Sequence, residues 1–273
     1  MDTPSPAAAV PLFTLQQGTA PLLISIPHVG TMIPEDIAAT MTPAALRVDD
    51  CDWHLDRLYA FAARFGASFL MPSCARYVID LNRPPDGGSL YPGRDTTGLV
   101  PLDTFEREPL YAPERAPDDA ELARRLDTYW QPYHEALVAE LGVLRARHGH
   151  VLLWEAHSIR SEVPRFFDGQ LPDFNFGTAD GASALPGLAD ELATIVSGHG
   201  GYTAVANGRF KGGYITRAYG KPEAGVHAVQ LELVQRTYMD ESPPYAYDEA
   251  RAAQVAPLIE SVVQAALARV IAG

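Results

Sequence analysis

The chain has only two cysteines, Cys51 and Cys74, and only two lysines, Lys211 and Lys221, among its 273 residues. Two cysteines are too few for a framework of disulfide bonds, which favours a reducing compartment. No apolar run reaches the length of a transmembrane helix, and no basic segment followed by an apolar one indicates a secretory signal. The sequence therefore predicts a cytoplasmic protein with no membrane partner.

Positive charge is also scarce, with 21 Lys and Arg against 34 Asp and Glu and a formal net charge of -13. A surface with this charge repels nucleic acid, and no basic stripe is present in the sequence. Nearly all the positive charges are arginines, whose planar guanidinium binds carboxylates at two points. Arginines concentrated at one place can thus select an anionic small molecule even in an acidic protein.

Hydrophobic residues make up 47% of the chain, which is normal for a folded globular protein. Short apolar runs predict strands at residues 22–26, 68–71, 77–81, 151–156, 202–206 and 226–234. Helical periodicity predicts helices at residues 52–65, 118–147 with a break at Pro132, 187–197 and 248–271. Long loops are expected at residues 82–117 and 158–185.

This alternation of strands and helices favours an α/β fold, namely a three-layer α/β/α sandwich around a mixed central sheet. No repeat or low-complexity linker divides the chain. We therefore expect a single catalytic domain over residues 1–273, with residues 1–9 as a flexible tail.

Two histidines close apolar runs: His28 follows the predicted strand 22–26, and His157 follows the strand 151–156. Ligands of α/β sheets bind at the carboxyl ends of the strands, so both imidazoles are expected in that crevice. His28 alone could also be a turn histidine bonded to the backbone, but its occurrence together with the other site residues favours a metal ligand. Together with a carboxylate, two imidazoles supply the ligands of a hydrolytic zinc site.

The carboxylate is expected from a cluster of three acids, Asp49, Asp50 and Asp52. One acid is enough to cap the helix that follows. Three adjacent carboxylates repel one another unless a cation offsets their charge. We expect Asp52 to be the metal ligand, but the pattern leaves Asp49 and Asp50 open.

Two glutamates lie within apolar strands. Glu155 precedes His157 by two residues and shares its face, so it is expected to orient His157 or exchange protons, although a buried ion pair is an alternative. Glu232 is the only charged residue near the centre of strand 226–234. Desolvation raises the pKa of such a carboxylate and suits it to general-base catalysis, whereas an internal salt bridge to an arginine is the structural alternative.

Substrate-binding residues are expected at two further places. Asn82 and Arg83 are adjacent at the end of the predicted strand 77–81, and the pair can bind a carboxylate at two points. Tyr214 and Arg217 follow two glycines that allow close approach of the backbone. A surface position is the simpler interpretation of any one arginine, but the set predicts an anion-binding pocket.

These motifs together resemble the N-formylglutamate amidohydrolases, also called N-formylglutamate deformylases. The resemblance covers roughly residues 20–241 and rests on six segments, namely residues 25–30, 50–59, 76–84, 154–158, 212–217 and 230–239. The family is similar in fold to the zinc carboxypeptidases and the N-acetylmuramoyl-alanine amidases. In these relatives a histidine, an acid and a second histidine hold zinc, a late glutamate is the base, and an Asn-Arg pair binds a substrate carboxylate.

The resemblance implies a zinc-exopeptidase-like fold and hydrolysis of N-formyl-L-glutamate to formate and L-glutamate, the last step of one route of histidine degradation. It implies one divalent metal, Zn²⁺, held by His28, Asp52 and His157, with Glu232 as the base. The two carboxylates of the substrate would require two arginines, Arg83 and Arg217. Glu155 departs from the family, in which an aspartate is expected.

Two alternatives stay open at this point. The same metal site would serve a zinc amidase or carboxypeptidase that acts on another N-acyl amino acid or peptide. A non-catalytic ligand-binding protein of this fold is the other alternative, although binding alone does not require a positioned base.

Overall fold

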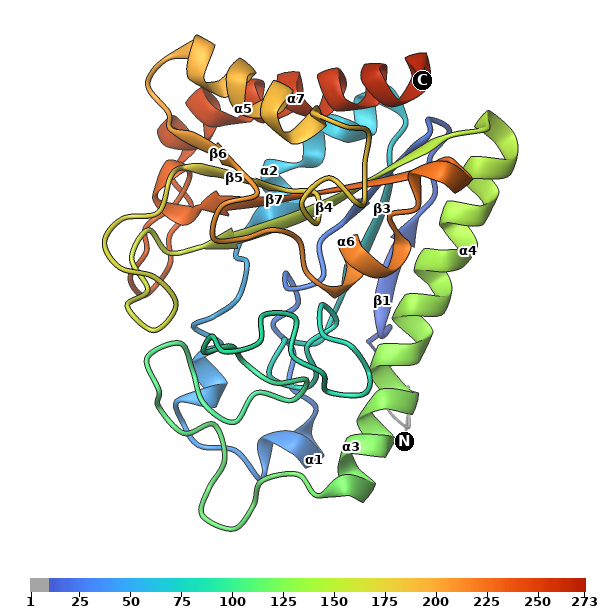
Figure 1. The fold of residues 1–273 in the computed structure, drawn as a ribbon. Helices are drawn as coiled ribbons and strands as arrows, with labels where there is room; N and C mark the ends of the chain where they lie inside the picture. Colours follow the sequence, from blue (N-terminus) through green and yellow to red (C-terminus); the bar gives the residue numbers. More distant parts are fainter. Residues whose placement is uncertain (1–9) are drawn as a thin grey trace, which may run out of the picture.

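The computed structural model describes residues 10–273 (Figure 1). The tail expected at residues 1–9 lies outside the described residues. A seven-stranded sheet crosses the molecule in the order β1-β3-β2-β4-β7-β5-β6. Its strands are β1 Phe13–Gln16, β2 Leu22–Ser25, β3 Ser68–Pro72, β4 Val151–Ile159, β5 Phe174–Gly177, β6 Ala204–Ala206 and β7 Val226–Val234. The central strands β3, β2, β4 and β7 are parallel, whereas β1 pairs with β3 and β5 with β7 in the antiparallel direction.

Helices cover both faces of the sheet, which confirms the predicted α/β architecture. Helices α2, α5 and α7 pack on one face, and α4 and α6 lie on the other (Figure 1). The helices are α1 Glu35–Ala38, α2 Leu55–Leu58, α3 Asp119–Arg125, α4 Gln131–His148, α5 Leu188–His199, α6 Tyr214–Tyr219 and α7 Glu249–Ala272. Short 3₁₀ turns occur at Ala45–Arg47, Ala60–Phe65, Pro222–Ala224 and Gln235–Thr237.

The apolar residues of the central strands divide between two cores according to the strand alternation. In β4, Leu152 and Trp154 face the core beneath α7, whereas Val151 and Leu153 face the core beneath α4. Both sets are fully buried, as expected for parallel strands covered by helices on both sides. The alternation continues to the carboxyl end of β4, so Glu155 and His157 lie on the α4 side of the sheet.

Several predicted elements differ from the observed ones. The helix predicted at 52–65 is one α-helical turn, α2, followed by the 3₁₀ turn Ala60–Phe65. Residues 77–81 form buried turns rather than a strand. The loop predicted at 158–185 contains β5, a four-residue strand whose Phe-Asn-Phe-Gly sequence is too short to stand out from the surrounding Pro, Asp and Gly residues.

The break predicted at Pro132 is a π-helical turn, Leu126–Trp130, which joins α3 to α4 and leaves the proline in the first turn of α4. A proline at that place needs no backbone N–H and is well tolerated. The helices α3 and α4 therefore follow one another without an intervening loop, from the end of the molecule that holds α1 up past β1 (Figure 1).

Helix α7 is long and apolar enough to cross a membrane by length and composition alone. Its apolar side is occupied within the protein, because Val255, Ile259, Val262 and Ala266 are completely buried against the sheet and α5. We therefore interpret α7 as a core helix.

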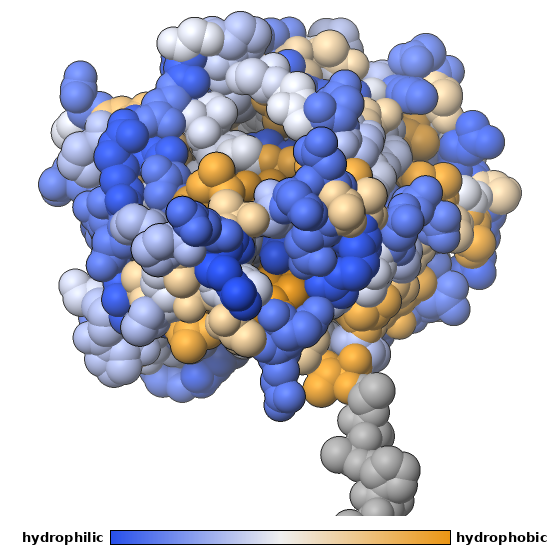
Figure 2. All heavy atoms as spheres, turned by 90° about the horizontal axis from the view of Figure 1, so that it is seen from below, coloured by the Kyte–Doolittle hydropathy of each residue, from blue (hydrophilic) through white to orange (hydrophobic). Residues whose placement is uncertain are grey.

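The opposite end of the molecule, where residues 82–117 lie, is irregular and largely hydrophilic. Figure 2 shows this side, on which hydrophobic residues occur in small separate groups. The segment is tied to the main body by buried contacts such as Leu99 and Leu110, which join the core beneath α4. It forms one wall of the cavity described next.

Candidate active site

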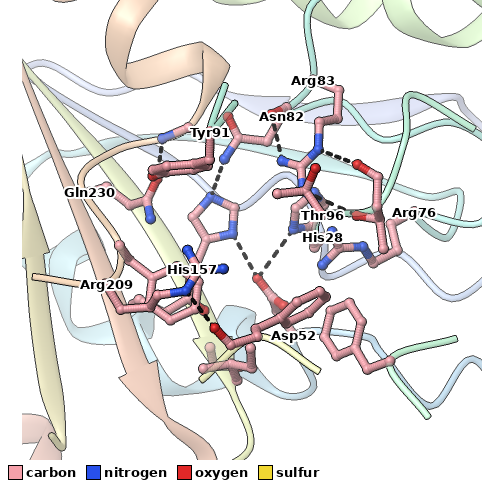
Figure 3. Close-up of a pocket in the computed structure, with 18 residues that line it drawn as sticks. His28, Asp52, Arg76, Asn82, Arg83, Tyr91, Thr96, His157, Arg209 and Gln230 are labelled. Carbon is pink, nitrogen blue, oxygen red and sulfur yellow. Dashed lines mark hydrogen bonds and ion pairs between the residues drawn. The ribbon is translucent and has the colours of Figure 1, made fainter. Parts of the chain in front are cut away.

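Three side chains from distant segments converge beside the carboxyl ends of β2 and β4. The ligand atoms of His28, Asp52 and His157 all lie within 4.8 Å of one another, and all three residues are buried. Asp52 Oδ2 lies 2.9 Å from His157 Nδ1 and 3.7 Å from His28 Nδ1. Figure 3 shows the three side chains pointing toward a common centre.

The backbone around His28 explains how the chain brings these groups together. The Asp52 backbone N–H donates to the His28 carbonyl at 3.0 Å, which fixes the acid beside the first histidine. Gly30 packs so closely against the next segment that a Cβ there would lie 2.3 Å from the Cys74 carbonyl oxygen. A glycine is therefore required in the turn that carries His28.

The other two acids of the cluster are engaged elsewhere. Asp50 accepts hydrogen bonds from the Tyr77 hydroxyl at 2.7 Å and the Phe105 backbone N–H at 2.9 Å. Asp49 accepts from Arg47 Nε at 2.9 Å and from the Tyr245 hydroxyl at 2.7 Å. Of the three acids that the sequence left open, Asp52 is the one that the structure brings to both histidines.

A carboxylate lies behind each histidine. His28 Nε2 donates to Asp80 Oδ1 at 2.7 Å, and His157 Nε2 donates to Glu155 Oε1 at 2.6 Å. Both bonds leave Nδ1 directed toward Asp52. Histidines that bind metal characteristically donate their second nitrogen to a carboxylate in this way, because the bond fixes the tautomer and makes the ring more basic.

Glu155 is completely buried behind His157 and does not line the cavity. Its second oxygen, Oε2, accepts hydrogen bonds from the Thr216 hydroxyl and, at 3.0 Å, from the Thr216 backbone N–H. The sequence suggested two roles for Glu155, namely to orient His157 or to exchange protons. These contacts fit the orienting role, because Glu155 has no direct access to a substrate.

Asp80 was not singled out from the sequence. It lies in the buried turns at 77–81, where it accepts from His28, from Arg76 Nη2 at 2.6 Å and from the Asn82 backbone N–H at 2.9 Å. The available signal was one acid within an otherwise apolar Tyr77–Leu81 run, since a buried carboxylate needs partners.

The electrostatics of the two histidines differ. Burial and the nearby charge of Arg76 lower the pKa of His28, which favours the neutral imidazole that binds metals. Burial also opposes protonation of His157, but the carboxylates of Glu155 and Asp52 outweigh it and raise the pKa of His157 well above its usual value. The site around His157 thus holds excess negative charge that a cation would balance.

Glu232 lies beside His157 on the neighbouring strand, because the two residues are register partners in the β4–β7 ladder. It is buried and lines the same cavity. Burial raises the pKa of Glu232 to about 8, even though the charge of His157 lowers it. No ion pair within residues 10–273 neutralises Glu232, so the salt bridge considered as an alternative is not formed.

The cavity extends from the histidines between residues 82–117 and the segment before α6. His28, Asp52, His157 and Glu232 line one part of it. The remaining wall includes three arginines, four aromatic rings and several polar groups, namely Arg76, Arg83, Arg209, Tyr91, Phe105, Phe166, Phe210, Asn82, Thr96 and Gln230. Figure 3 shows how these side chains surround the histidines.

The four residues expected to bind substrate divide into two pairs. Asn82 and Arg83 line the cavity, and Asn82 Nδ2 lies 3.0 Å from His157 Nε2. Tyr214 and Arg217 are not among the cavity residues. Tyr214 packs against Trp130, and Arg217 Nε donates to the Gly212 carbonyl at 2.9 Å. Both lie in α6, a helix that the sequence did not predict.

The donor set fits a divalent metal such as zinc. It offers two imidazole nitrogens and one carboxylate oxygen, which is a common ligand set for catalytic zinc, and each imidazole has the supporting carboxylate that such sites require. Two further buried carboxylates, Glu155 and Glu232, flank the cluster, and within residues 10–273 neither they nor Asp52 form an ion pair with an arginine.

Comparison with known proteins identifies the family of this chain. The family model described as N-formylglutamate amidohydrolase matches residues 20–239. The chain belongs to the N-formylglutamate amidohydrolase family. All of the residues just described, from His28 to Glu232, fall within the matched range.

Individual members of the N-formylglutamate amidohydrolase family are similar over nearly their whole length. The N-formylglutamate deformylase of Pseudomonas aeruginosa is 50% identical over 256 residues, which covers 92% of this chain and 96% of that protein. The N-formylglutamate deformylase of Pseudomonas putida is 48% identical over 257 residues, covering 94% and 96%.

Solved structures show the same fold. The N-formylglutamate amidohydrolase of Ralstonia eutropha JMP134 superposes with a TM-score of 0.77 and 26% identity, covering 94% of this chain and 98% of that one. A protein of Agrobacterium tumefaciens shares the fold with a TM-score of 0.71 at 18% identity, covering 95% and 96%.

Proposed function

We propose that this chain is a metal-dependent N-formylglutamate deformylase, which hydrolyses N-formyl-L-glutamate to formate and L-glutamate. The activity is supported by two curated deformylases that are 50% and 48% identical over nearly the whole chain. The single structural observation that carries the mechanism is the convergence of His28, Asp52 and His157 in a buried cluster beside Glu232.

In this proposal, His28, Asp52 and His157 hold one divalent metal ion, most simply Zn²⁺. A zinc ion bound by three such ligands acidifies water and polarises a carbonyl oxygen. Asp80 and Glu155 keep the two imidazoles in the tautomer that exposes Nδ1 to the cavity.

Glu232 is the proposed base. Two acids, Asp52 and Glu232, line the cavity. Among residues 10–273, the Glu232 carboxylate forms no ion pair with an arginine and no hydrogen bond with a histidine, so it is available as a base. It can accept a proton from an attacking water and return it to the amide nitrogen as glutamate departs. A carboxylate with a pKa near the working pH serves both steps, because it gains and loses the proton at little cost.

Substrate recognition falls to the arginine-lined half of the cavity. Formyl is the smallest acyl group, so most of the specificity must come from the glutamyl part and its two carboxylates. Arg83 is held in place by three hydrogen bonds: Nε donates to the Thr97 carbonyl at 2.9 Å, Nη1 to the Asn82 carbonyl at 3.2 Å and Nη2 to the Thr97 hydroxyl at 3.1 Å. Its remaining N–H groups are free to bind one substrate carboxylate.

We further propose that the enzyme acts in the cytoplasm, at the last step of a histidine-degradation route. Its partner is then a small dicarboxylate, consistent with a net charge of -13 that disfavours nucleic acid.

The test is turnover of N-formyl-L-glutamate by purified protein before and after removal of metal with a chelator. Activity that disappears on chelation and returns with zinc or cobalt supports the proposal. Full activity of metal-free protein contradicts the metal site. Comparison of formyl-, acetyl- and succinyl-glutamate with formyl-aspartate distinguishes a deformylase from an amidase for another N-acyl amino acid, and tight binding without turnover would indicate a binding protein.

A further inference from the structure

Arg209 lies at the cavity wall, in the connection between β6 and α6, and no motif in the sequence pointed to it. It is one of three arginines that line the cavity, with Arg76 and Arg83 (Figure 3). Arg76 is already paired, since its Nη2 donates to Asp80 at 2.6 Å. Among the ion pairs within residues 10–273, none involves Arg83 or Arg209, so two cavity guanidinium groups have no acidic partner.

The contacts of Arg209 orient the group and leave its terminal nitrogens available. Its Nε donates a hydrogen bond to the Phe166 carbonyl at 2.8 Å. Among residues 10–273, the Arg209 side chain makes no other hydrogen bond. The guanidinium also lies over the Tyr91 ring, with Cζ 5.5 Å from the ring centroid. Both Nη groups therefore retain their N–H donors in the geometry that binds a carboxylate at two points.

The charge around Arg209 also calls for an anion. Burial and the positive charge of Arg94 lower the pKa of Arg209, Tyr91 and Glu232 oppose this, and the charge of Arg83 adds a smaller lowering contribution. Positive groups that repel one another inside a cavity are stabilised when a negatively charged ligand enters. A dicarboxylate supplies two negative charges, which matches the two unpaired guanidinium groups.

We infer that Arg209, and not Arg217, is the second substrate-binding arginine, and that Arg83 and Arg209 each bind a different carboxylate of the substrate. This inference rests on the proposed function, because it assumes a glutamyl substrate. Arg217 does not line the cavity. Its guanidinium also packs against the Tyr91 ring, with Cζ 5.5 Å from the ring centroid.

The test uses three substrates: N-formyl-L-glutamate, N-formyl-L-glutamine, which lacks the side-chain carboxylate, and N-formyl-L-isoglutamine, which lacks the α-carboxylate. Each is assayed with wild-type protein and with Arg83→Ala, Arg209→Ala and Arg217→Ala. Loss of a two-point bond to a carboxylate should raise KM for N-formylglutamate by roughly ten- to hundredfold. The effect on kcat should be smaller, because Arg209 does not touch the proposed metal ligands.

The decisive result is the pattern across the amides. Wild type should discriminate against both amides. Arg209→Ala should lose discrimination against one amide only, and Arg83→Ala should lose it against the other. Arg94→Ala is the matched control. The substitution removes a positive charge near Arg209, but Arg94 is exposed and does not line the cavity. Arg209→Lys, which keeps the charge but not the fork, should recover KM only in part.

Three outcomes overturn the inference: Arg209→Ala discriminates against both amides as wild type does, Arg83→Ala and Arg209→Ala lose the same discrimination, or Arg217→Ala shows the pattern expected of Arg209→Ala. Circular dichroism and thermal unfolding establish that each variant is folded, and Arg209→Lys provides the readout if the alanine variant is not. Failure of wild type to cleave N-formylglutamate contradicts the proposed function instead, which keeps the two failures distinct.

Discussion

The sharpest consequence of the structure concerns Asp80, a residue that touches neither the cavity nor the proposed metal. Its carboxylate accepts three hydrogen bonds, from His28 Nε2 at 2.7 Å, Arg76 Nη2 at 2.6 Å and the Asn82 backbone N–H at 2.9 Å. Burial opposes ionisation of Asp80, but its interactions with His28 and Arg76 outweigh it and hold its pKa well below the usual range. Asp80 is therefore a charged acceptor that makes His28 a stronger ligand.

Asp80→Asn keeps the size of the side chain and removes its charge. An amide oxygen can still accept from His28, but the ring loses the carboxylate that increases its basicity. Removal of such a supporting carboxylate typically weakens metal affinity by ~10–100-fold, equivalent to about 1.4–2.7 kcal/mol. The same change leaves the buried Arg76 without its partner, which costs on the order of 3–5 kcal/mol of folding stability.

A second variant separates these two effects. In Arg76→Met with Asp80→Asn, the buried charges disappear together, so stability should return toward wild type. Metal affinity should remain low, because His28 still lacks its carboxylate. Zinc affinity is measured by competition with a chromogenic chelator, and stability by urea unfolding of the metal-free proteins. Asp86→Asn, an exposed carboxylate in the following segment, is the control. Wild-type zinc affinity in folded Asp80→Asn would refute the role of Asp80.

Three further predictions follow from the same geometry. Glu232→Gln should lower kcat by ~10²–10⁴-fold with little change in zinc affinity, and a fall of less than tenfold would argue against Glu232 as the base. In metal-free protein, Glu232 binds a proton more tightly in the folded state, because folding raises its pKa from 4.5 to about 8. The protonated group therefore stabilises the folded state fully below pH 4.5, and this stabilisation is lost as the pH rises through 8, at up to ~1.4 kcal/mol per pH unit. Urea unfolding across this range should show that Glu232→Gln removes this slope, and equal slopes would contradict the raised pKa. Gly30→Ala should destabilise the protein by about 1–3 kcal/mol, because its Cβ would meet the Cys74 carbonyl, whereas Gly142→Ala on α4 has open space and should not destabilise it.

The strands that carry the site were predictable because their apolar runs are long and uninterrupted. Strand β7 has the predicted bounds, and β4 begins at the predicted residue. Their parallel pairing brings His157 and Glu232 side by side, a neighbourhood that the strand-end argument did not predict, since it expected only His28 and His157 at strand ends. The convergence of His28, Asp52 and His157 was predicted from the same pattern together with a family resemblance, and the structure brings these three side chains together.

The residues that escaped prediction are those whose role depends on tertiary contacts. Asp80 lies in turns whose sequence resembles a strand, and its importance arises from His28 and Arg76, which bind its two different carboxylate oxygens. Arg209 and Arg217 flank the same glycine-rich segment, and both contact the Tyr91 ring. Sequence spacing does not reveal which of the two enters the cavity, because the turn of α6 that redirects Arg217 was itself unpredicted.

The proposed mechanism depends most directly on a metal ion at the buried cluster of His28, Asp52 and His157. A crystal of zinc-loaded protein, measured on both sides of the zinc absorption edge, tests this claim. One strong anomalous peak is expected within bonding distance of His28 Nδ1, Asp52 Oδ2 and His157 Nδ1, with the Glu232 carboxylate facing it across the cavity. A peak at other residues, or no peak between these three side chains in fully active protein, would contradict it.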